Sequence, residues 1–163
     1  MKILTLALLL ISLATVSASS GVISFGLGAN VTFPSADLKD NVATGYGATG
    51  LLKFGLLPIV DLTGGVEYIK FTSKDVGAGV PSSGTAFGLL VGGRVSILAI
   101  GYLGAETGTY TFTPSVNGYS GDSFTKGFFA PMAGVKFSMF DISARYVSAG
   151  NDRFWGLRGL IWL

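Results

Sequence analysis

Residues 22–33 (VISFGLGANVTF) decide the fold class, because apolar and small or polar side chains alternate along them. One face carries Ile23, Phe25, Leu27, Ala29, Val31 and Phe33, and the opposite face carries Val22, Ser24, Gly26, Gly28, Asn30 and Thr32. A period of two is typical of a β-strand and is not produced by the 3.6-residue period of a helix. The stretch has 12 residues, and a tilted strand needs about 9–11 to cross a membrane.

Three further segments show the same alternation. In residues 46–57 (YGATGLLKFGLL), Tyr46, Ala48, Leu52, Phe54 and Leu56 oppose Thr49, Leu51 and Lys53. In residues 85–98, Phe87, Leu89, Val91, Val95 and Ile97 oppose Gly88, Gly92, Arg94 and Ser96. In the closing segment, Trp155, Leu157, Ile161 and Leu163 share one face, and Arg158 takes the other. We therefore predict a wall with an apolar outside and a charged inside.

The composition favours membrane strands over helices. Hydrophobic residues make up 49% of the 163 residues and charged residues only 12%, whereas a soluble domain has about 25% charged residues. The 25 glycines disfavour long helices. The best candidate for a membrane helix, residues 86–105, contains Arg94, which would cost about 2.5–3.5 kcal/mol facing lipid. The formal charge of +2 gives no basic patch for nucleic acid.

The N-terminal segment has the pattern of a secretory signal. Lys2 precedes an apolar run from Ile3 to about Leu13, and Val16-Ser17-Ala18 is a small-residue cleavage pattern. The alternative is an uncleaved membrane helix, but the run is shorter than the ~20 residues that a span requires. We expect residues 1–18 to be a cleaved signal peptide and residues 19–163 to form one exported domain.

Turn residues divide the exported domain into eight strands. We place these at 22–33, 44–57, 61–72, 85–98, 101–112, 124–139, 140–149 and 153–163. Short and long connections alternate, which is typical of an antiparallel membrane barrel. We therefore predict an all-β, closed up-and-down antiparallel transmembrane β-barrel with both termini periplasmic. Pro131 lies within a strand and cannot donate to the ladder, so we expect a bulge there.

From Gly21 to Leu163 the chain resembles the small OmpA/OmpX-type outer-membrane barrels. The resemblance rests on the export signal, the strand pattern and the terminal strand "WGLRGLIWL". It implies a location in the cell outer membrane, contact with the lipid bilayer and lipopolysaccharide, and insertion by the barrel-assembly machinery. That machinery reads a last strand that usually ends in Phe or Trp, whereas here Leu163 follows Trp162.

The inward-facing charges form the candidate functional site. They are Lys53, Glu67, Arg94, Glu106, Lys136, Asp141, Arg145 and Arg158. They lie at similar distances from the tight turns or the C-terminus, and placing Glu106 inside also turns Tyr102 and Tyr110 inward. The interior of an eight-stranded barrel is just wide enough for side chains, and unpaired buried charges are costly. We therefore expect a salt-bridged plug, the alternative being a narrow, slightly anion-favouring pore.

Other chemistry finds little support in the sequence. Residues 45–50 (GYGATG) match a dinucleotide fingerprint, but no βαβ unit surrounds them, so we expect no nucleotide. The chain has no histidine for a Ser-His-Asp triad, and no acidic spacing resembles an EF-hand loop. We expect no catalysis, metal or cofactor.

Two roles remain open for the barrel. One is a structural or surface-interaction role, and the other is a transporter for small or hydrophobic solutes. A soluble secreted carrier is a remote third alternative, because it would need polar outer faces. Aromatic girdles are expected at the two rims, formed by Tyr46, Tyr68, Phe71, Phe124, Phe137 and Tyr146.

Overall fold

The antiparallel strands pair in a closed ring, because the last free edge, β4, also pairs with β5. The computed structural model describes residues 23–75, 81–97, 100–116 and 119–163, so the expected signal peptide lies outside the described residues. The strands are β1 (Ile23–Ala36), β2 (Gly45–Leu57), β3 (Val60–Asp75), β4 (Pro81–Ile97), β5 (Gly101–Val116), β6 (Tyr119–Ser120), β7 (Phe124–Phe137), β8 (Phe140–Ala149) and β9 (Asp152–Trp162), and the helix α2 is Asp37–Asn41.

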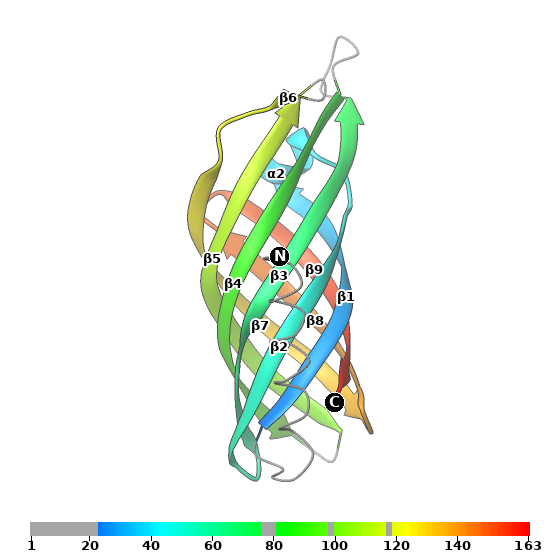
Figure 1. The fold of residues 1–163 in the computed structure, drawn as a ribbon, viewed down its shortest axis with the longest axis vertical. Helices are drawn as coiled ribbons and strands as arrows, with labels where there is room; N and C mark the ends of the chain where they lie inside the picture. The colour runs from blue at the N-terminus through cyan, green and yellow to red at the C-terminus, as the bar shows by residue number, and fades with distance from the viewer. Residues whose placement is uncertain (1–22, 76–80, 98–99, 117–118) are drawn as a thin grey trace, which may run out of the picture.

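Eight of these strands form the barrel, in the ring order β1-β2-β3-β4-β5-β7-β8-β9 (Figure 1). The predicted all-β, closed, eight-stranded antiparallel barrel is therefore confirmed. Strands β3, β4 and β5 have 16, 17 and 16 residues, whereas β8 and β9 have 10 and 11. The barrel is consequently taller on the β3–β5 side, because these strands extend into segments that the sequence assigned to loops.

The two ends of the barrel differ in their connections. At the short-turn end, two residues join β2 to β3, and Ser138 and Met139 join β7 to β8, with Ser138 in the left-handed region at φ 55°. Leu163 exchanges both backbone hydrogen bonds with Phe25 at this end. The opposite, long-loop end carries α2 and the two-residue strand β6. In the described part of the chain, no helix is long and apolar enough to cross a membrane.

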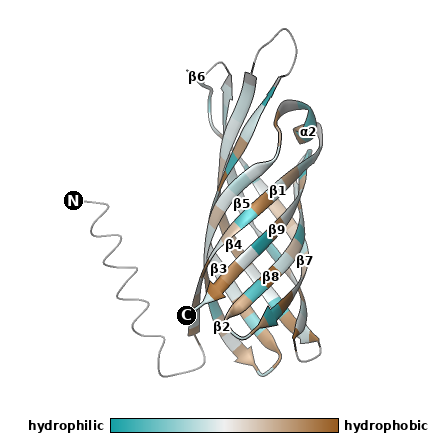
Figure 2. Cartoon of the chain, turned by 90° about the vertical axis from the view of Figure 1, so that its right-hand side faces the viewer, coloured by the Kyte–Doolittle hydropathy of each residue, from teal (hydrophilic) through white to brown (hydrophobic). Residues whose placement is uncertain are grey.

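The predicted alternation of faces is confirmed in the described residues of β1, β2, β4 and β9. In β9, burial alternates at every residue from Arg153 to Trp162, and the colours of hydrophobic and hydrophilic residues alternate along the strands in Figure 2. Outward-facing charges on the wall, such as Lys70 and Arg153, lie toward the long-loop end. On β2 the outward positions from Leu56 to Tyr46 carry no charge.

The expected bulge at Pro131 is wrong. Pro131 pairs in register with Ala105 of β5, and the pairs Phe129–Ser148 and Met132–Arg145 keep one register between β7 and β8. The pairing of β7 with β8 has a gap between these two pairs, and the register is the same on both sides of the gap. Because proline has no backbone N–H, it loses a hydrogen bond of the ladder. It adds no residue to the strand, so no register shift is needed.

Candidate functional site

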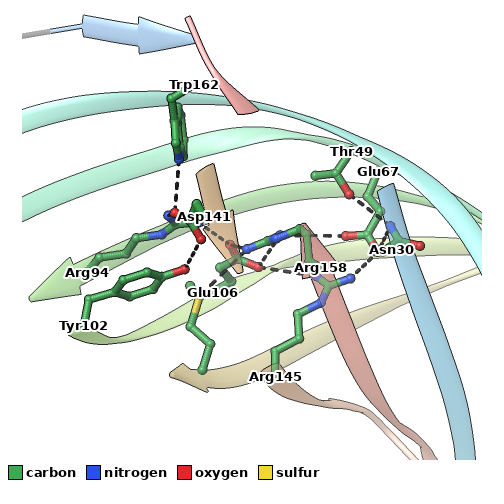
Figure 3. Close-up of polar contacts among 11 residues, drawn as sticks. Asn30, Thr49, Glu67, Arg94, Tyr102, Glu106, Asp141, Arg145, Arg158 and Trp162 are labelled. Carbon is green, nitrogen blue, oxygen red and sulfur yellow. Dashed lines mark hydrogen bonds and ion pairs between the residues drawn. The ribbon is translucent and has the colours of Figure 1, made fainter. Parts of the chain in front are cut away.

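Six charged side chains meet inside the barrel and form what we call the ionic layer. They are Glu67, Arg94, Glu106, Asp141, Arg145 and Arg158, and each is at most 4% exposed. They come from β3, β4, β5, β8 and β9, so the layer joins walls on different sides of the ring (Figure 3). Three arginines face three carboxylates, and the layer is formally neutral.

Glu106 is the most connected carboxylate of the ionic layer. Arg158 donates to both of its oxygens, over 3.1 Å from Nη1 and 2.5 Å from Nη2. Arg145 adds a donor at 3.4 Å, and Arg94 Nη2 lies 4.0 Å away. Two-point arginine–carboxylate contacts are among the stronger hydrogen bonds in proteins, so Glu106 fixes the orientation of Arg158.

Glu67 holds the other side of the layer. Arg145 Nη2 donates to its Oε1, and Arg158 Nη1 lies 4.0 Å from its Oε2. The same Oε1 accepts a hydrogen bond from Asn30 Nδ2 at 3.0 Å, and that amide also donates to Thr49 Oγ1 at 3.0 Å. These uncharged partners from β1 and β2 extend the network around the ring, which the alternation of the sequence alone did not predict.

Asp141 lies closer to the short-turn end and receives three donors. These are Arg94 Nη1 at 2.7 Å, Tyr102 Oη at 2.6 Å and Trp162 Nε1 at 3.1 Å. Trp162 is 7% exposed and faces inward, so it is not an aromatic residue of the outer wall. The period-two pattern contains the signal for this inward position, because Trp162 lies on the same face of β9 as Arg158.

Lys53 and Lys136 do not join the ionic layer. Neither forms an ion pair within 4.0 Å among the described residues. Lys53 is 9% exposed, with its Nζ 4.8 Å from the centre of the Trp162 ring, and Lys136 is exposed. Both line a cavity of about 350 Å³ at the short-turn end, which we call the mouth cavity; Asp61, Arg94, Tyr102 and Asp141 also line it.

Toward the long-loop end, an aromatic layer fills the interior. It consists of Phe71, Tyr110, Phe112, Phe128 and Phe154, each at most 5% exposed. Tyr110 contacts three of these rings, with centroid distances of 4.6 Å to Phe128 and 5.8 Å to Phe112 and Phe154. The rim position expected for Phe71 is wrong, because Phe71 continues the inward face of Glu67 and packs edge-on against Phe154.

Above the aromatic layer lies an apolar cavity of about 310 Å³. Its lining includes Phe71, Phe112 and Phe124. Leu38 of helix α2 and Val42, the residue that follows the helix, also line it. Asp152, also in its lining, pairs with Lys126 at 2.6 Å. The cavity is a candidate for holding a small apolar group, but the aromatic layer and the ionic layer both lie between it and the mouth cavity.

The outer wall displays the four residues of the C-terminal strand that the sequence places there. Trp155, Leu157, Ile161 and Leu163 are between 44% and 60% exposed. Tyr46, Tyr68 and Phe124 are more than 40% exposed, and Phe137, at 74%, ends β7 at the short-turn end. Below the outward charges at the long-loop end, apolar and aromatic side chains therefore cover the outside, and charges fill the middle of the inside.

The comparisons with known proteins concern the fold. No family model and no curated protein matches the sequence. Among solved structures, Ail, the attachment invasion locus protein of Yersinia pestis, matches with a TM-score of 0.59 and 15% identity over 86% of this chain and 96% of that chain. The fold is that of small outer-membrane β-barrels.

Two further solved structures support the same conclusion. Neisserial surface protein A matches with a TM-score of 0.59 and 14% identity, over 88% of this chain and 97% of that chain. The N-terminal β-barrel domain of Pseudomonas aeruginosa OprF matches with a TM-score of 0.53 and 15% identity, over 86% and 97%. At this identity the likeness concerns the arrangement of strands, and it carries no ligand or partner over to this chain.

Proposed function

We propose that the chain is an outer-membrane barrel with a structural or surface-interaction role and a lumen closed to ions. The fold shared with three outer-membrane proteins supports the location, and one structure of Ail was determined in a phospholipid bilayer nanodisc. The expected signal peptide, residues 1–18, would direct export. The observation that carries the proposal is the combination of an uncharged outer band with a neutral, buried ionic layer.

The outer band has the height of a membrane. The uncharged outward positions of β2 run from Leu56 to Tyr46, which is about 33 Å along a strand that rises ~3.3 Å per residue. With the usual tilt of about 40°, this corresponds to ~25 Å along the barrel axis, the height of the apolar band of outer-membrane barrels. Such a band would be an unfavourable surface for a soluble carrier.

We propose that the short-turn end faces the periplasm and that the long-loop end faces outward. Short periplasmic turns and longer outer loops are typical of these barrels. The chain has no cysteine, so single cysteines can report the orientation. Asp40 at the long-loop end and Met139 at the short-turn end are both exposed, which makes Asp40→Cys and Met139→Cys a matched pair.

The test uses a membrane-impermeant maleimide on intact cells. The Asp40→Cys protein should be labelled at once, and the Met139→Cys protein should be labelled only after the envelope is opened. The reverse order would overturn the orientation, and recovery of both proteins in the soluble periplasmic fraction would overturn the membrane location. A change of gel mobility on boiling would show that each variant is folded.

The ionic layer supports a closed lumen. Arginine–carboxylate pairs bridge five strands, and the aromatic layer fills the interior on the long-loop side. In planar bilayers the folded protein should therefore show no steady ohmic conductance. A general porin reconstituted in the same membrane provides the positive control, and steady conductance by this chain would support the narrow-pore alternative.

The partners that we propose are the lipid bilayer, lipopolysaccharide at the outer leaflet, and the barrel-assembly machinery during insertion. The terminal strand, with Trp155, Leu157 and Ile161 facing out, supplies the apolar face that such a machinery would handle. We propose no catalytic role, because the chain lacks histidine and its buried carboxylates are engaged by arginines. We propose no binding of nucleic acid or nucleotide.

One observation favours the transporter alternative. The apolar cavity of about 310 Å³ at the long-loop end could receive a small hydrophobic solute. Uptake of a fluorescent hydrophobic probe into protein-containing vesicles, compared with its binding alone, separates the two roles. Binding without transfer across the membrane would fit the closed lumen, and transfer would support the transporter.

A further inference from the structure

The mouth cavity has a charge imbalance that the ionic layer does not share. Its lining includes three cations, Lys53, Arg94 and Lys136, and two carboxylates, Asp61 and Asp141. Asp141 already receives hydrogen bonds from Arg94, Tyr102 and Trp162. The two lysines therefore remain without a carboxylate within 4.0 Å among the described residues.

Lys53 and Lys136 lie on opposite sides of the mouth. In the ring order, β2 and β7 are separated by three strands in either direction, so the two lysines project into the cavity from opposed walls. The charged groups that act on Lys53 are Lys136, Asp61 and Arg94. Two ammonium groups that share a narrow mouth repel each other, and an anion between them would remove that repulsion.

Arg94 provides a buried donor at the inner side of the cavity. It is 4% exposed, and its Nη1 is engaged by Asp141. Its Nε and Nη2 donate no hydrogen bond within the described part of the chain. Lys53 is also nine-tenths buried, and burying an ammonium group without an anionic partner is unfavourable. Its contact with the Trp162 ring offsets only part of that penalty.

We propose that the mouth cavity binds a small phosphate-type oxyanion between Lys53 and Lys136, with Arg94 at its inner side. A volume of about 350 Å³ holds such an ion together with several waters. The anion balances the positive charge of the two lysines, and Arg94 adds positive charge at the inner side of the cavity. This binding site adjoins the ionic layer, with which it shares Arg94, and it does not depend on which compartment the short-turn end faces.

Trp162 supplies a direct reporter of this site. The chain has two tryptophans, and Trp155 lies on the outer wall, so Trp155→Phe leaves Trp162 as the single tryptophan, which is excited selectively over the tyrosines. In dodecyl maltoside micelles, which contain no phosphate, inorganic phosphate should change the Trp162 emission with saturation. Ionic strength is held constant with sodium chloride, so that screening alone produces no signal.

The variants Lys53→Gln and Lys136→Gln should each weaken phosphate binding by about tenfold or more, since each removes a charge-assisted hydrogen bond. Lys70→Gln, on the outer wall, is the matched control and should leave the affinity unchanged. Lys136 is exposed, so its variant tests the proposal even if Lys53→Gln does not fold, as judged by gel mobility on boiling.

A second series, with phosphatidylglycerol added to the micelles, distinguishes a free anion from a lipid headgroup as the source of the phosphate. A response to inorganic phosphate that needs both lysines supports a soluble ion, and a lysine-dependent response to the lipid alone supports a headgroup. The proposal is overturned if neither phosphate source changes the emission, or if the Lys70→Gln protein loses as much affinity as the Lys136→Gln protein.

Discussion

The ionic layer and the aromatic layer fill the same barrel by different interactions. In the ionic layer, Glu106 receives hydrogen bonds from both Arg145 and Arg158, so the contribution of this layer to stability depends on charge balance. In the aromatic layer, Tyr110 packs against three rings, so its contribution depends on shape. A single substitution should therefore leave an uncompensated charge in one layer and an empty space in the other.

The largest effect is expected for Glu106→Gln in the ionic layer. Loss of this carboxylate leaves Arg145 and Arg158 with only Glu67, and breaking a buried ion pair typically costs about 3–5 kcal/mol. The free energy of unfolding, measured by urea titration in detergent micelles, should fall by this amount. The control is Asp152→Asn at the long-loop end, whose pair with Lys126 is partly exposed and should lose no more than ~1 kcal/mol. Equal losses in the two proteins would contradict the assigned role of charge balance.

A comparable effect is expected for Phe154→Ala in the aromatic layer. Phe154 is fully buried and contacts Phe71 and Tyr110, and removing a buried phenyl ring costs about 3 kcal/mol or more. This loss comes from packing, so it should be the same at low and high salt. The control Phe129→Ala changes an outward ring that is 57% exposed. If unfolding were equally affected by both phenylalanine variants, the aromatic layer would not be a packed core.

The smallest of the three effects concerns a glycine that makes room for a ring. A Cβ at Gly88 would lie 2.6 Å from Tyr110 Cε1, so Gly88→Ala should displace Tyr110 and cost about 1–3 kcal/mol through overpacking. A Cβ at Gly159 meets nothing within 4 Å, and Gly159→Ala should leave the urea midpoint unchanged or raise it. A Gly88→Ala protein as stable as the wild type would mean that Tyr110 moves freely in the interior.

The sequence predicted the ionic layer better than the aromatic layer, for a physical reason. A charge on a strand of a membrane wall has one acceptable direction, so period-two alternation assigned Arg94 and Arg158 to the inside. An aromatic ring is stable facing lipid, at the rim or in the interior, and composition does not discriminate among these positions. Phe71 was therefore expected at the rim. It lies four residues after Glu67 on the same strand, and this even spacing places both side chains on the inward face.

Strand existence was predictable, whereas strand ends were less so. The described wall strands all match predicted segments, but β3 and β4 extend beyond them into Gly- and Ser-containing stretches. Those residues continue to pair because neighbouring strands supply partners for their backbone groups. The bulge expected at Pro131 was wrong for the same reason, because the backbone pairs on either side of Pro131 hold the strand in register.

By itself, the sequence determined that the chain alternates sides, forms eight wall strands and places its mid-strand charges inside. Only the tertiary structure decided which charges meet. Glu67 and Arg145 are 78 residues apart, and they pair because closing the ring staggers β3 and β8 until both side chains reach one level. The same stagger brings Lys53 and Lys136 to the mouth instead of the ionic layer. Side-chain direction is a local property of a strand, whereas side-chain height in a barrel is set by the stagger of all the strands together.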